Sequence, residues 1–255
     1  MPRFYIDDPS KCIRDDVITI GGEDARHISR SLRMKVGETL EVSDFSGILY
    51  SCSITGFTED EVTLGILEKK LCDSEPYVRV RVFQALPKGD KLDTVIQKCT
   101  ELGAFDFTPV LTSRCISRPD DKSAKKKCDR WQKISQEAAK QCGRGIIPKV
   151  NDVCSFTEAV REMSECTLSV MCYECEDGYS IKKCIEDNIT KLGDGASVGI
   201  FIGPVGGIAP EEAQKAKDAG IITAGLGKRI LRTETAPIFA VSAVMLLTGN
   251  CEYKI

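Results

Sequence analysis

Histidine and long apolar runs are what this sequence most plainly lacks. His27 is the only histidine in 255 residues, which excludes a histidine-based catalytic triad and a multi-histidine metal site within one chain. No stretch reaches the ~20 consecutive apolar residues that span a membrane. The first residues, Met1 to Asp8, carry acids where a secretory signal would be basic and then apolar. We therefore expect a cytoplasmic protein with no membrane partner.

The familiar nucleotide-binding signatures are also missing. No Gly-x-Gly-x-x-Gly follows a first strand, and no Gly-x-x-x-x-Gly-Lys-Ser/Thr phosphate loop occurs. Gly193-Asp-Gly195 precedes an apolar strand, so its order is wrong for a Rossmann turn. These absences argue against a common dehydrogenase, a kinase and a Rossmann-type methyltransferase.

Cysteine is abundant, but its spacing indicates no framework. Thirteen cysteines are scattered along the chain, and the one Cys-x-x-Cys pair is Cys172 to Cys175. A structural zinc site takes four ligands, usually as two close pairs, and an odd number of cysteines argues against a disulfide scaffold. We expect reduced thiols and no metal.

Positive charge is concentrated in the middle of the chain. The net charge is only −3, but residues 75–150 carry 16 Lys and Arg against 9 Asp and Glu. The segments on either side are acidic, so the excess is local and could neutralise phosphates. For Lys122 to Lys127 taken alone, an ordinary solvated surface explains the charge equally well.

Two domains with different periodicity are predicted. Residues 1–74 contain short alternating or β-rich segments between glycines, which predicts a small β-barrel. Residues 75–255 alternate apolar strands with helical segments, which predicts an α/β domain with a parallel sheet. The acidic stretch Glu68 to Pro76 is interpreted as the linker. Expected strands are 17–20, 39–43, 48–54, 61–67, 78–83, 107–111, 167–171, 197–202 and 221–224; expected helices are 24–34, 90–102, 125–141, 210–219 and 237–247.

Two glycine-rich turns follow strands near the C-terminus. The first is Ile202-Gly-Pro-Val-Gly-Gly207, and the second extends from Gly225 to Ala236. Glycine lets a ligand approach the backbone closely, and open α/β sheets bind ligands at the carboxyl ends of their strands. The two turns are therefore predicted to form opposite walls of one pocket, although either alone could be an ordinary strand-to-helix turn.

These turns carry a family resemblance. Ile202-Gly-Pro-Val-Gly-Gly207 and Leu226-Gly-Lys-Arg-Ile-Leu-Arg-Thr-Glu-Thr-Ala236 resemble the C-terminal signature of the RsmE family, the 16S ribosomal RNA uracil-N3 methyltransferases of the SPOUT superfamily. The resemblance extends through nearly the whole chain. Further matching motifs are Met1–Tyr5, Ala25–Met34, Lys88–Lys91, Ile96–Gly103, Ser113–Cys115, Trp131–Ile134 and Glu137–Arg144.

The resemblance implies a fold, a cofactor and an assembly. The N-terminal domain would be PUA-like, the second would be a trefoil-knotted SPOUT domain, and the chain would be a homodimer with its pocket near the subunit interface. S-adenosyl-L-methionine would lie bent against three loops, with its adenine contacted mainly by backbone groups. The residues implied to bind it are Met171, Cys172, Tyr173, Glu174, Ile202, Gly203, Pro204, Gly206, Gly207, Leu226, Gly227, Ile230, Leu231, Arg232, Thr235 and Ala236.

Methyl transfer to uracil N3 requires alignment and the loss of one proton. Arg232 and Glu234 lie in the second loop and are the candidate catalytic residues. Arg232 would offset charge on a uracil oxygen, and Glu234 would accept the proton or orient Arg232. Alternatively, Glu234 only favours the positive N-terminus of the last helix, with Thr235 or Ala236 at the cap and Pro237 in the first turn.

RNA contacts are assigned by position and resemblance only. The candidates are Arg3, Arg30, Arg33, Arg114, Arg118 and Arg144, and the partner is 16S ribosomal RNA or the assembled small subunit. One residue departs from the family, because Val205 stands where relatives usually carry Glu. This departure motivates one alternative, an RNA-binding protein on the same fold that has lost methyl transfer. A further alternative is an enzyme acting on small nucleotides, which the basic middle segment disfavours.

Overall fold

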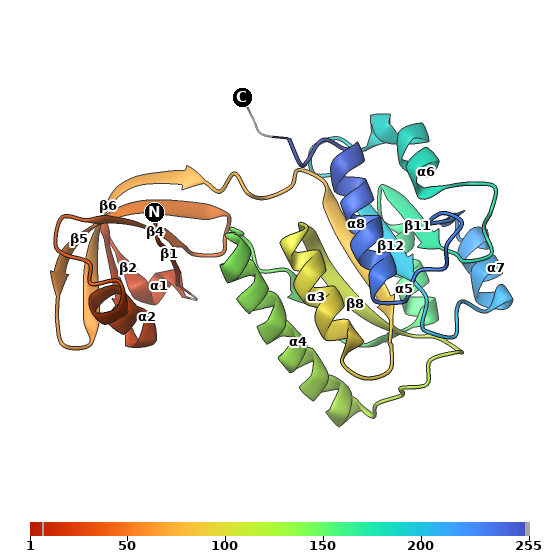
Figure 1. Cartoon of the computed structure of the whole chain (residues 1–255), viewed down its shortest axis with the longest axis horizontal. Coiled ribbons are helices and arrows are strands. Elements are labelled where there is room, and N and C mark those ends of the chain that lie inside the picture. Colours follow the sequence, from red (N-terminus) through yellow and green to blue (C-terminus); the bar gives the residue numbers. More distant parts are fainter. Residues whose placement is uncertain (7, 253–255) are drawn as a thin grey trace. The chain divides into compact units, whose positions relative to one another are not determined.

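The computed structural model describes residues 1–6 and 8–252. The chain forms two compact units, each with its own hydrophobic core. The first unit comprises Met1–Glu75 and Ala139–Ile147, and the second comprises Pro76–Ala138 and the chain from Pro148 onward. Each unit is described separately below (Figure 1).

The first unit is built on a six-stranded sheet in the order β1-β4-β5-β6-β3-β2. β1 pairs in parallel with β4, and the other pairs are antiparallel. Alternate side chains of β3 and β6, such as Ile18 and Leu64, are fully buried, as the alternating sequence predicts. The strands are β1 (Arg3–Tyr5), β2 (Ile13–Arg14), β3 (Val17–Gly21), β4 (Thr39–Ser43), β5 (Ile48–Phe57) and β6 (Glu61–Leu71); the helical segments are α1 (Pro9–Cys12), α2 (Gly22–Arg26) and the π-helical turn η1 (His27–Ser31).

The interpretation of residues 68–76 as a linker is wrong at its start. β6 continues to Leu71, and residues 68–71 pair with residues 48–51 of β5. The charged side chains there are exposed, and this end of β6 pairs with β5 but not with β3. Charge alone therefore did not mark the end of the sheet.

The segment 139–147 completes the first unit. The carboxylate of Glu75 lies 2.6 Å from Arg144 Nη2 and accepts a 2.8 Å hydrogen bond from the Gly145 amide. The carbonyl of Gly143 accepts hydrogen bonds from the side chains of Arg3 and Ser74. A segment distant in sequence is thus fixed to both ends of the N-terminal chain.

The second unit contains a sheet in which every pair is parallel. Its order is β10-β8-β7-β12-β11-β13, with β9 also paired to β8. Every residue of β11 is buried, which explains why this strand is apolar without alternation. The strands are β7 (Arg79–Ala85), β8 (Ala104–Leu111), β9 (Lys149–Val150), β10 (Cys154–Ser155), β11 (Leu168–Cys172), β12 (Ser197–Ile202) and β13 (Ile222–Ala224).

Helices cover the parallel sheet. α8 contacts β7 and β12 and packs between α3 and α6 (Figure 1). α5 packs on β8 and β10, and its Phe156 meets Phe201 of β12 edge to face at 5.5 Å. The helical segments are α3 (Lys91–Glu101), α4 (Asp121–Cys142), α5 (Phe156–Ser164), α6 (Ile181–Asp187), the 3-10 turn η2 (Ile189–Lys191), α7 (Pro210–Asp218) and α8 (Thr235–Leu247).

The predicted fold class is confirmed as a β-rich N-terminal part followed by an α/β part with a parallel sheet. The trefoil knot stays a prediction. Among the helices of the described residues, none has the length and apolar character that a membrane span requires.

Candidate active site

A cavity of about 420 Å³ opens where three strands of the parallel sheet end. It lies at the carboxyl ends of β11, β12 and β13, which are neighbours in the order β12-β11-β13. The chain that follows each strand contributes to its wall, so both glycine-rich turns reach the same cavity. Its volume falls within the roughly 300–1,000 Å³ of small-molecule sites. The carboxyl ends of these strands thus provide the kind of site that open α/β folds use for ligands.

Most of the residues expected at the cofactor line this cavity. They are Cys172, Tyr173, Glu174, Ile202, Gly203, Pro204, Gly206, Gly207, Leu226, Gly227, Ile230, Leu231, Arg232 and Ala236. Two do not line it: Met171 is fully buried in β11, and Thr235 is the first residue of α8. Six lining residues were not among the expected ones, namely Lys91, Glu176, Val205, Gly225, Arg229 and Thr233.

Three glycines shape the walls because a side chain has no room there. A Cβ on Gly203 would lie 2.7 Å from Ile208, and one on Gly225 would lie 2.3 Å from the carbonyl oxygen of Glu176. At Gly207 the backbone has φ +72°, and a Cβ would come within 2.0 Å of the Glu174 carboxylate. The cavity wall at these positions is therefore bare backbone.

The turn after β12 is held by hydrogen bonds to two charged side chains. Glu174 Oε1 accepts a 2.9 Å hydrogen bond from the Ile208 amide. Arg114 Nη1 donates to the carbonyls of Gly206 and Ile208, at 3.1 and 3.2 Å. Arg114, expected at the RNA, is thus also bonded to the first glycine turn.

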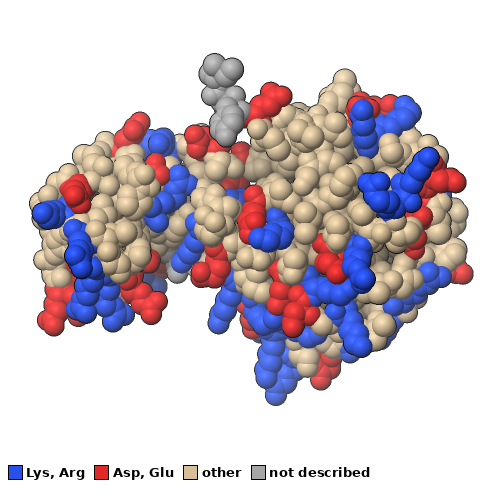
Figure 2. Space-filling model, viewed as in Figure 1, with Lys and Arg blue, Asp and Glu red and all other residues tan. Residues whose placement is uncertain are grey.

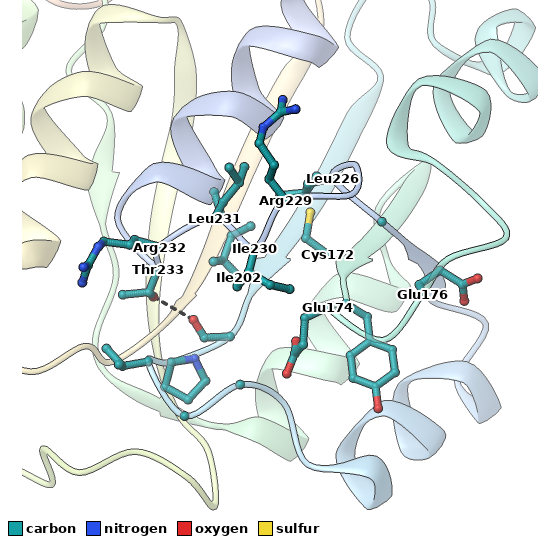
Figure 3. Close-up of a pocket in the computed structure, with 18 of the residues that line it drawn as sticks. Cys172, Glu174, Glu176, Ile202, Leu226, Arg229, Ile230, Leu231, Arg232 and Thr233 are labelled. Carbon is teal, nitrogen blue, oxygen red and sulfur yellow. Dashed lines mark hydrogen bonds between the residues drawn. The ribbon is translucent and has the colours of Figure 1, made fainter.

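The two glycine turns are joined at the cavity floor. Thr233 Oγ1 donates a 2.8 Å hydrogen bond to the carbonyl of Gly203, drawn dashed in Figure 3. Thr233 is buried although its loop neighbours Arg232 and Ile230 are exposed. The second turn therefore points one hydroxyl inward to fix the first.

A third wall follows β11 and carries negative charge. Glu176 Oε2 accepts a 2.7 Å hydrogen bond from Thr223 Oγ1 of β13. This hydrogen bond from Thr223 is the main reason that the pKa of Glu176 lies below its usual value, so its carboxylate is ionised at neutral pH. Glu174 adds a second carboxylate to the same wall.

Another part of the cavity lining consists of apolar side chains together with positively charged ones. Ile202, Ile230 and Leu231 lie together, and Arg232 extends away from them (Figure 3). Lys91, the first residue of α3, also lines the cavity. Its Nζ lies 3.0 Å from Glu234 Oε2.

Glu234 forms an ion pair with Lys91 and does not itself line the cavity. Desolvation raises its pKa, but the hydrogen bond from its own backbone, the hydrogen bond and charge of Lys91, and the charge of Arg232 outweigh that effect, so the pKa lies below its usual value. Glu234 is the N-cap residue of α8, yet its side chain makes no capping hydrogen bond. It is absent from the cavity lining, unlike Arg232 and Lys91.

One cysteine, Cys172, lines the cavity, and its side chain is buried. Burial raises the pKa of Cys172 to about 12, so its thiol stays neutral. Cys175 is exposed, and no disulfide joins any of the cysteines, all of which lie in the described part of the chain. Residues 1–6 and 8–252 contain no group of three or more His, Cys, Asp or Glu placed to hold a metal ion.

The six arginines expected at RNA fall into two groups. Arg30, Arg33, Arg114 and Arg118 are exposed, although the last two also donate hydrogen bonds to nearby backbone carbonyls. Arg3 is bonded to Glu41 and Gly143, and Arg144 is only 3% exposed beside Glu75. The last two hold the first unit together, and their guanidinium groups are committed to protein partners.

A basic face lies on α4. Cys128, Trp131 and Ser135 are buried, which turns Lys122, Lys126 and Lys133 outward. Lys and Arg side chains gather around the part of the second unit where α4 begins (Figure 2). In the described part of the chain, the ion pairs of α4 are made by Arg130 alone, with Asp90 and Asp93. The lysines are thus available to an anionic partner.

Comparison with protein-family models identifies the class. A model described as an RNA methyltransferase domain matches residues 73–245, and one described as an RNA methyltransferase PUA domain matches residues 20–67. Together with the parallel sheet and its two-turn cavity, these matches define an RNA methyltransferase with a PUA domain.

Whole-chain relatives identify the family. A Bacillus subtilis protein named ribosomal RNA small subunit methyltransferase E is 36% identical over 249 residues, 97% of each chain. A crystal structure of the Neisseria gonorrhoeae protein of that name, bound to S-adenosyl methionine, is similar with a TM-score of 0.75 and 30% identity over 97% of this chain and 98% of that one. A Legionella pneumophila putative methyltransferase with bound cofactor SAM is 27% identical, with a TM-score of 0.75 over 96% of each chain. The chain belongs to the ribosomal RNA small subunit methyltransferase E family.

Proposed function

We propose that this protein uses S-adenosyl-L-methionine to methylate N3 of a uridine in 16S ribosomal RNA. The observation that carries the proposal is that both glycine turns line one cavity, at the carboxyl ends of adjacent parallel strands, in a chain of this family. The Neisseria relative, similar over nearly its whole length, is bound to S-adenosyl methionine. The substrate would be the RNA itself or the assembled small subunit, and the site of action the cytoplasm.

The cavity fits this cofactor in shape and charge. Bare backbone at Gly203, Gly207 and Gly225 lets a flat base lie against the walls. Glu174 and Glu176 give one wall a negative charge, which favours a ligand that carries sulfonium and ammonium groups. When bound, the cofactor would supply an electrophilic methyl group.

The residues of this chain would handle the acceptor. Uracil N3 loses a proton as it gains the methyl group, so negative charge develops on the uracil oxygens. We assign Arg232 to offset that charge, with Lys91 as a second positive group in the cavity lining. Glu234 would hold Lys91 in place through their ion pair. Its lowered pKa makes it a weak base, so we do not assign it as the proton acceptor.

RNA would be held by exposed basic residues in both units. Arg30 and Arg33 belong to the part matched by the PUA model, and Arg118 follows β8 in the catalytic unit. Phosphate contacts of this kind orient a substrate without identifying its bases.

A homodimer is part of the same proposal, and the surface of α8 supports it. α8 contains no charged residue, and Phe239 and Leu246 are 45% and 69% exposed. A helix that is apolar on all sides is normally covered on all sides. We assign a second copy of the chain as the cover.

The test is methylation of small subunits purified from cells that lack the gene. With labelled S-adenosyl-L-methionine, nucleoside mass spectrometry should find the label in 3-methyluridine of 16S ribosomal RNA. Arg232→Ala should lower kcat about 100-fold or more while RNA affinity changes little. Label in another nucleoside would overturn the N3 assignment. Turnover of free uridine nucleotides would overturn the RNA assignment, and cofactor binding without any transfer would favour an RNA-binding protein.

A further inference from the structure

Gln84 is a polar side chain in a place where the fold needs an apolar one. It lies in β7, between β8 and β12, with 1% of its surface exposed. Its neighbours in the sheet register are Ile202 and Pro109. Strands inside a parallel sheet are normally apolar on both faces, because a buried amide loses its hydration.

The Gln84 amide connects the two walls of the cavity. Its Nε2 donates to Thr233 Oγ1 at 3.1 Å and to the Ala85 carbonyl at 3.0 Å, and lies 3.4 Å from the Gly203 carbonyl. Thr233 Oγ1 in turn donates to the Gly203 carbonyl at 2.8 Å. The Thr233 hydroxyl, which belongs to the second glycine turn, therefore accepts a hydrogen bond from Gln84 of β7 and donates one to Gly203 of the first turn.

This arrangement is costly for stability alone. Gln84 Oε1 is buried and has no hydrogen-bond partner among the described residues. An orphaned acceptor costs the fold its lost hydration, and this cost offsets part of what the hydrogen bonds of Nε2 contribute. Stability therefore explains a glutamine here less well than its bonds to both ligand walls do.

We propose that Gln84 is a positioning residue that couples the two glycine turns through Thr233 and holds the cavity in its ligand-binding shape. The inference rests on the proposed cofactor, since it treats the cavity as the binding site for S-adenosyl-L-methionine. Gln84 does not line the cavity, so it acts through Thr233 and Gly203, which do. Fixing both walls before binding removes an ordering cost from the binding step.

Calorimetric titration of S-adenosyl-L-methionine into the full-length protein tests this coupling. Gln84→Met keeps the length of the side chain and removes its hydrogen bonds, and Thr233→Val removes the hydroxyl while keeping the shape. Each should weaken binding about tenfold or more, and the double variant should be no weaker than the worse single one. Thr233→Ser, which keeps the hydroxyl, should bind within about twofold of wild type.

Thermal unfolding separates positioning from mere packing. Gln84→Met should lower the Tm less than the control variant does, because removal of the orphaned Oε1 offsets part of the loss of the Nε2 hydrogen bonds. The matched control is Thr108→Val in β8, which loses the 3.0 Å hydrogen bond from Asn151 away from the cavity. That variant should lower the Tm without changing the cofactor Kd.

The outcomes distinguish this inference from the proposed function. If wild type does not bind the cofactor, the proposed function fails. If wild type binds and both Gln84→Met and Thr233→Val bind within twofold of it, the coupling role is refuted. Additive losses in the double variant, or losses matched by a fall in Tm as large as that of Thr108→Val, also refute it.

Discussion

Glycine at position 207 is required by two separate constraints. Its φ of +72° is costly for any residue with a Cβ, and a Cβ would meet the Glu174 carboxylate at 2.0 Å. Gly207→Ala should therefore displace Glu174 from the Ile208 amide and open the turn. We expect cofactor affinity to fall about tenfold by calorimetry, since such a conformation costs roughly 1–2 kcal/mol.

Gly206 provides the matched control in the same turn. A Cβ there would have ordinary contacts no closer than 3.6 Å, with Arg114, and its φ is not positive. Gly206→Ala should keep nearly full affinity. Equal losses in the two variants would mean that the turn tolerates no side chain at all and that the Glu174 contact is irrelevant.

Glu234 should be a charged support and not a titrating base. Its folded pKa lies below the usual value, so the stability of its pair with Lys91 is fully present above the unfolded pKa near 4.5 and is lost as pH falls through the folded pKa. Between about pH 6 and about pH 9 the residue does not change charge. Glu234→Gln should therefore lower kcat moderately while leaving the shape of the pH–rate profile unchanged.

The comparison that checks this is the full profile of both proteins. Loss of an acid limb in Glu234→Gln, or activity reduced to background, would indicate that the carboxylate accepts the N3 proton. Arg232→Lys is a useful companion, because it keeps a positive charge while removing the planar fork of donors.

At the level of residues, local sequence motifs and long-range contacts differ in what they reveal. Gly203 and Leu226 stand in recognisable turns after apolar strands, so their place at the cavity was predictable. Lys91 reaches it only because the start of α3 lies beside the start of α8, a contact over 143 residues. Gln84 gave one local signal, a polar residue directly after the apolar pair Val82-Phe83, which points to a special role without naming the partner.

The basic face of α4 is expected to bind phosphate. Lys122 and Lys126 are exposed and make no ion pair within the described chain. Replacing both by Ala should weaken binding of 16S ribosomal RNA and reduce the slope of log K against log salt by about 1–2, since each phosphate contact contributes roughly 0.7–0.9. Fluorescence anisotropy over a salt series measures this slope.

A control with the same change in charge is available on α7. Lys215 and Lys217 are also exposed, and neither lines the cavity. Lys215→Ala with Lys217→Ala should leave the slope close to that of wild type. If the two pairs reduce it equally, the effect reflects net charge and α4 is an ordinary solvated helix.

At the level of elements, strong periodicity predicted most of the fold. β3, β4, β12 and the longer helices appear at the expected places. α5 was missed, although the sequence contains its capping box. The Ser155 side chain accepts from the Glu158 amide, and the Glu158 side chain accepts from the Ser155 amide. β9 and β10 are two residues each and exist only through pairing with β8, which no local pattern encodes.

The apolar face of α8 should decide the oligomeric state. Phe239 and Leu246 are seven residues apart and therefore share one side of the helix. We expect wild type to sediment as a dimer and Leu246→Glu to sediment as a monomer, because a buried charge without a partner is costly. Analytical ultracentrifugation at several protein concentrations provides the measurement.

Leu71→Glu supplies the comparison for this variant. Leu71 is 81% exposed at the end of β6, in the other unit, and its replacement should leave the sedimenting mass unchanged. Wild type that sediments as a monomer at micromolar concentration would contradict the proposed dimer.

For the whole molecule, sequence placed a boundary near residue 75 but assigned residues 139–147 to the second domain. The structure groups them with the first unit. The reason is a set of specific contacts, above all Arg144 with Glu75, and paired charges distant in sequence leave no periodic trace. Length and composition could predict two domains but not this exchange of chain.

The placement of residues 139–147 has a practical consequence for protein engineering. A fragment ending at residue 75 would keep the carboxylate of Glu75 but lose its guanidinium partner. It would also uncover Cys72, which lies so close to Gly145 that a Cβ on that glycine would be 2.5 Å away. Such a fragment would lack the segment Ala139–Ile147 that completes the first unit, and it should be less stable than the full chain. Chimaeras that exchange the N-terminal unit between relatives should therefore carry both stretches of chain, Met1–Glu75 and Ala139–Ile147.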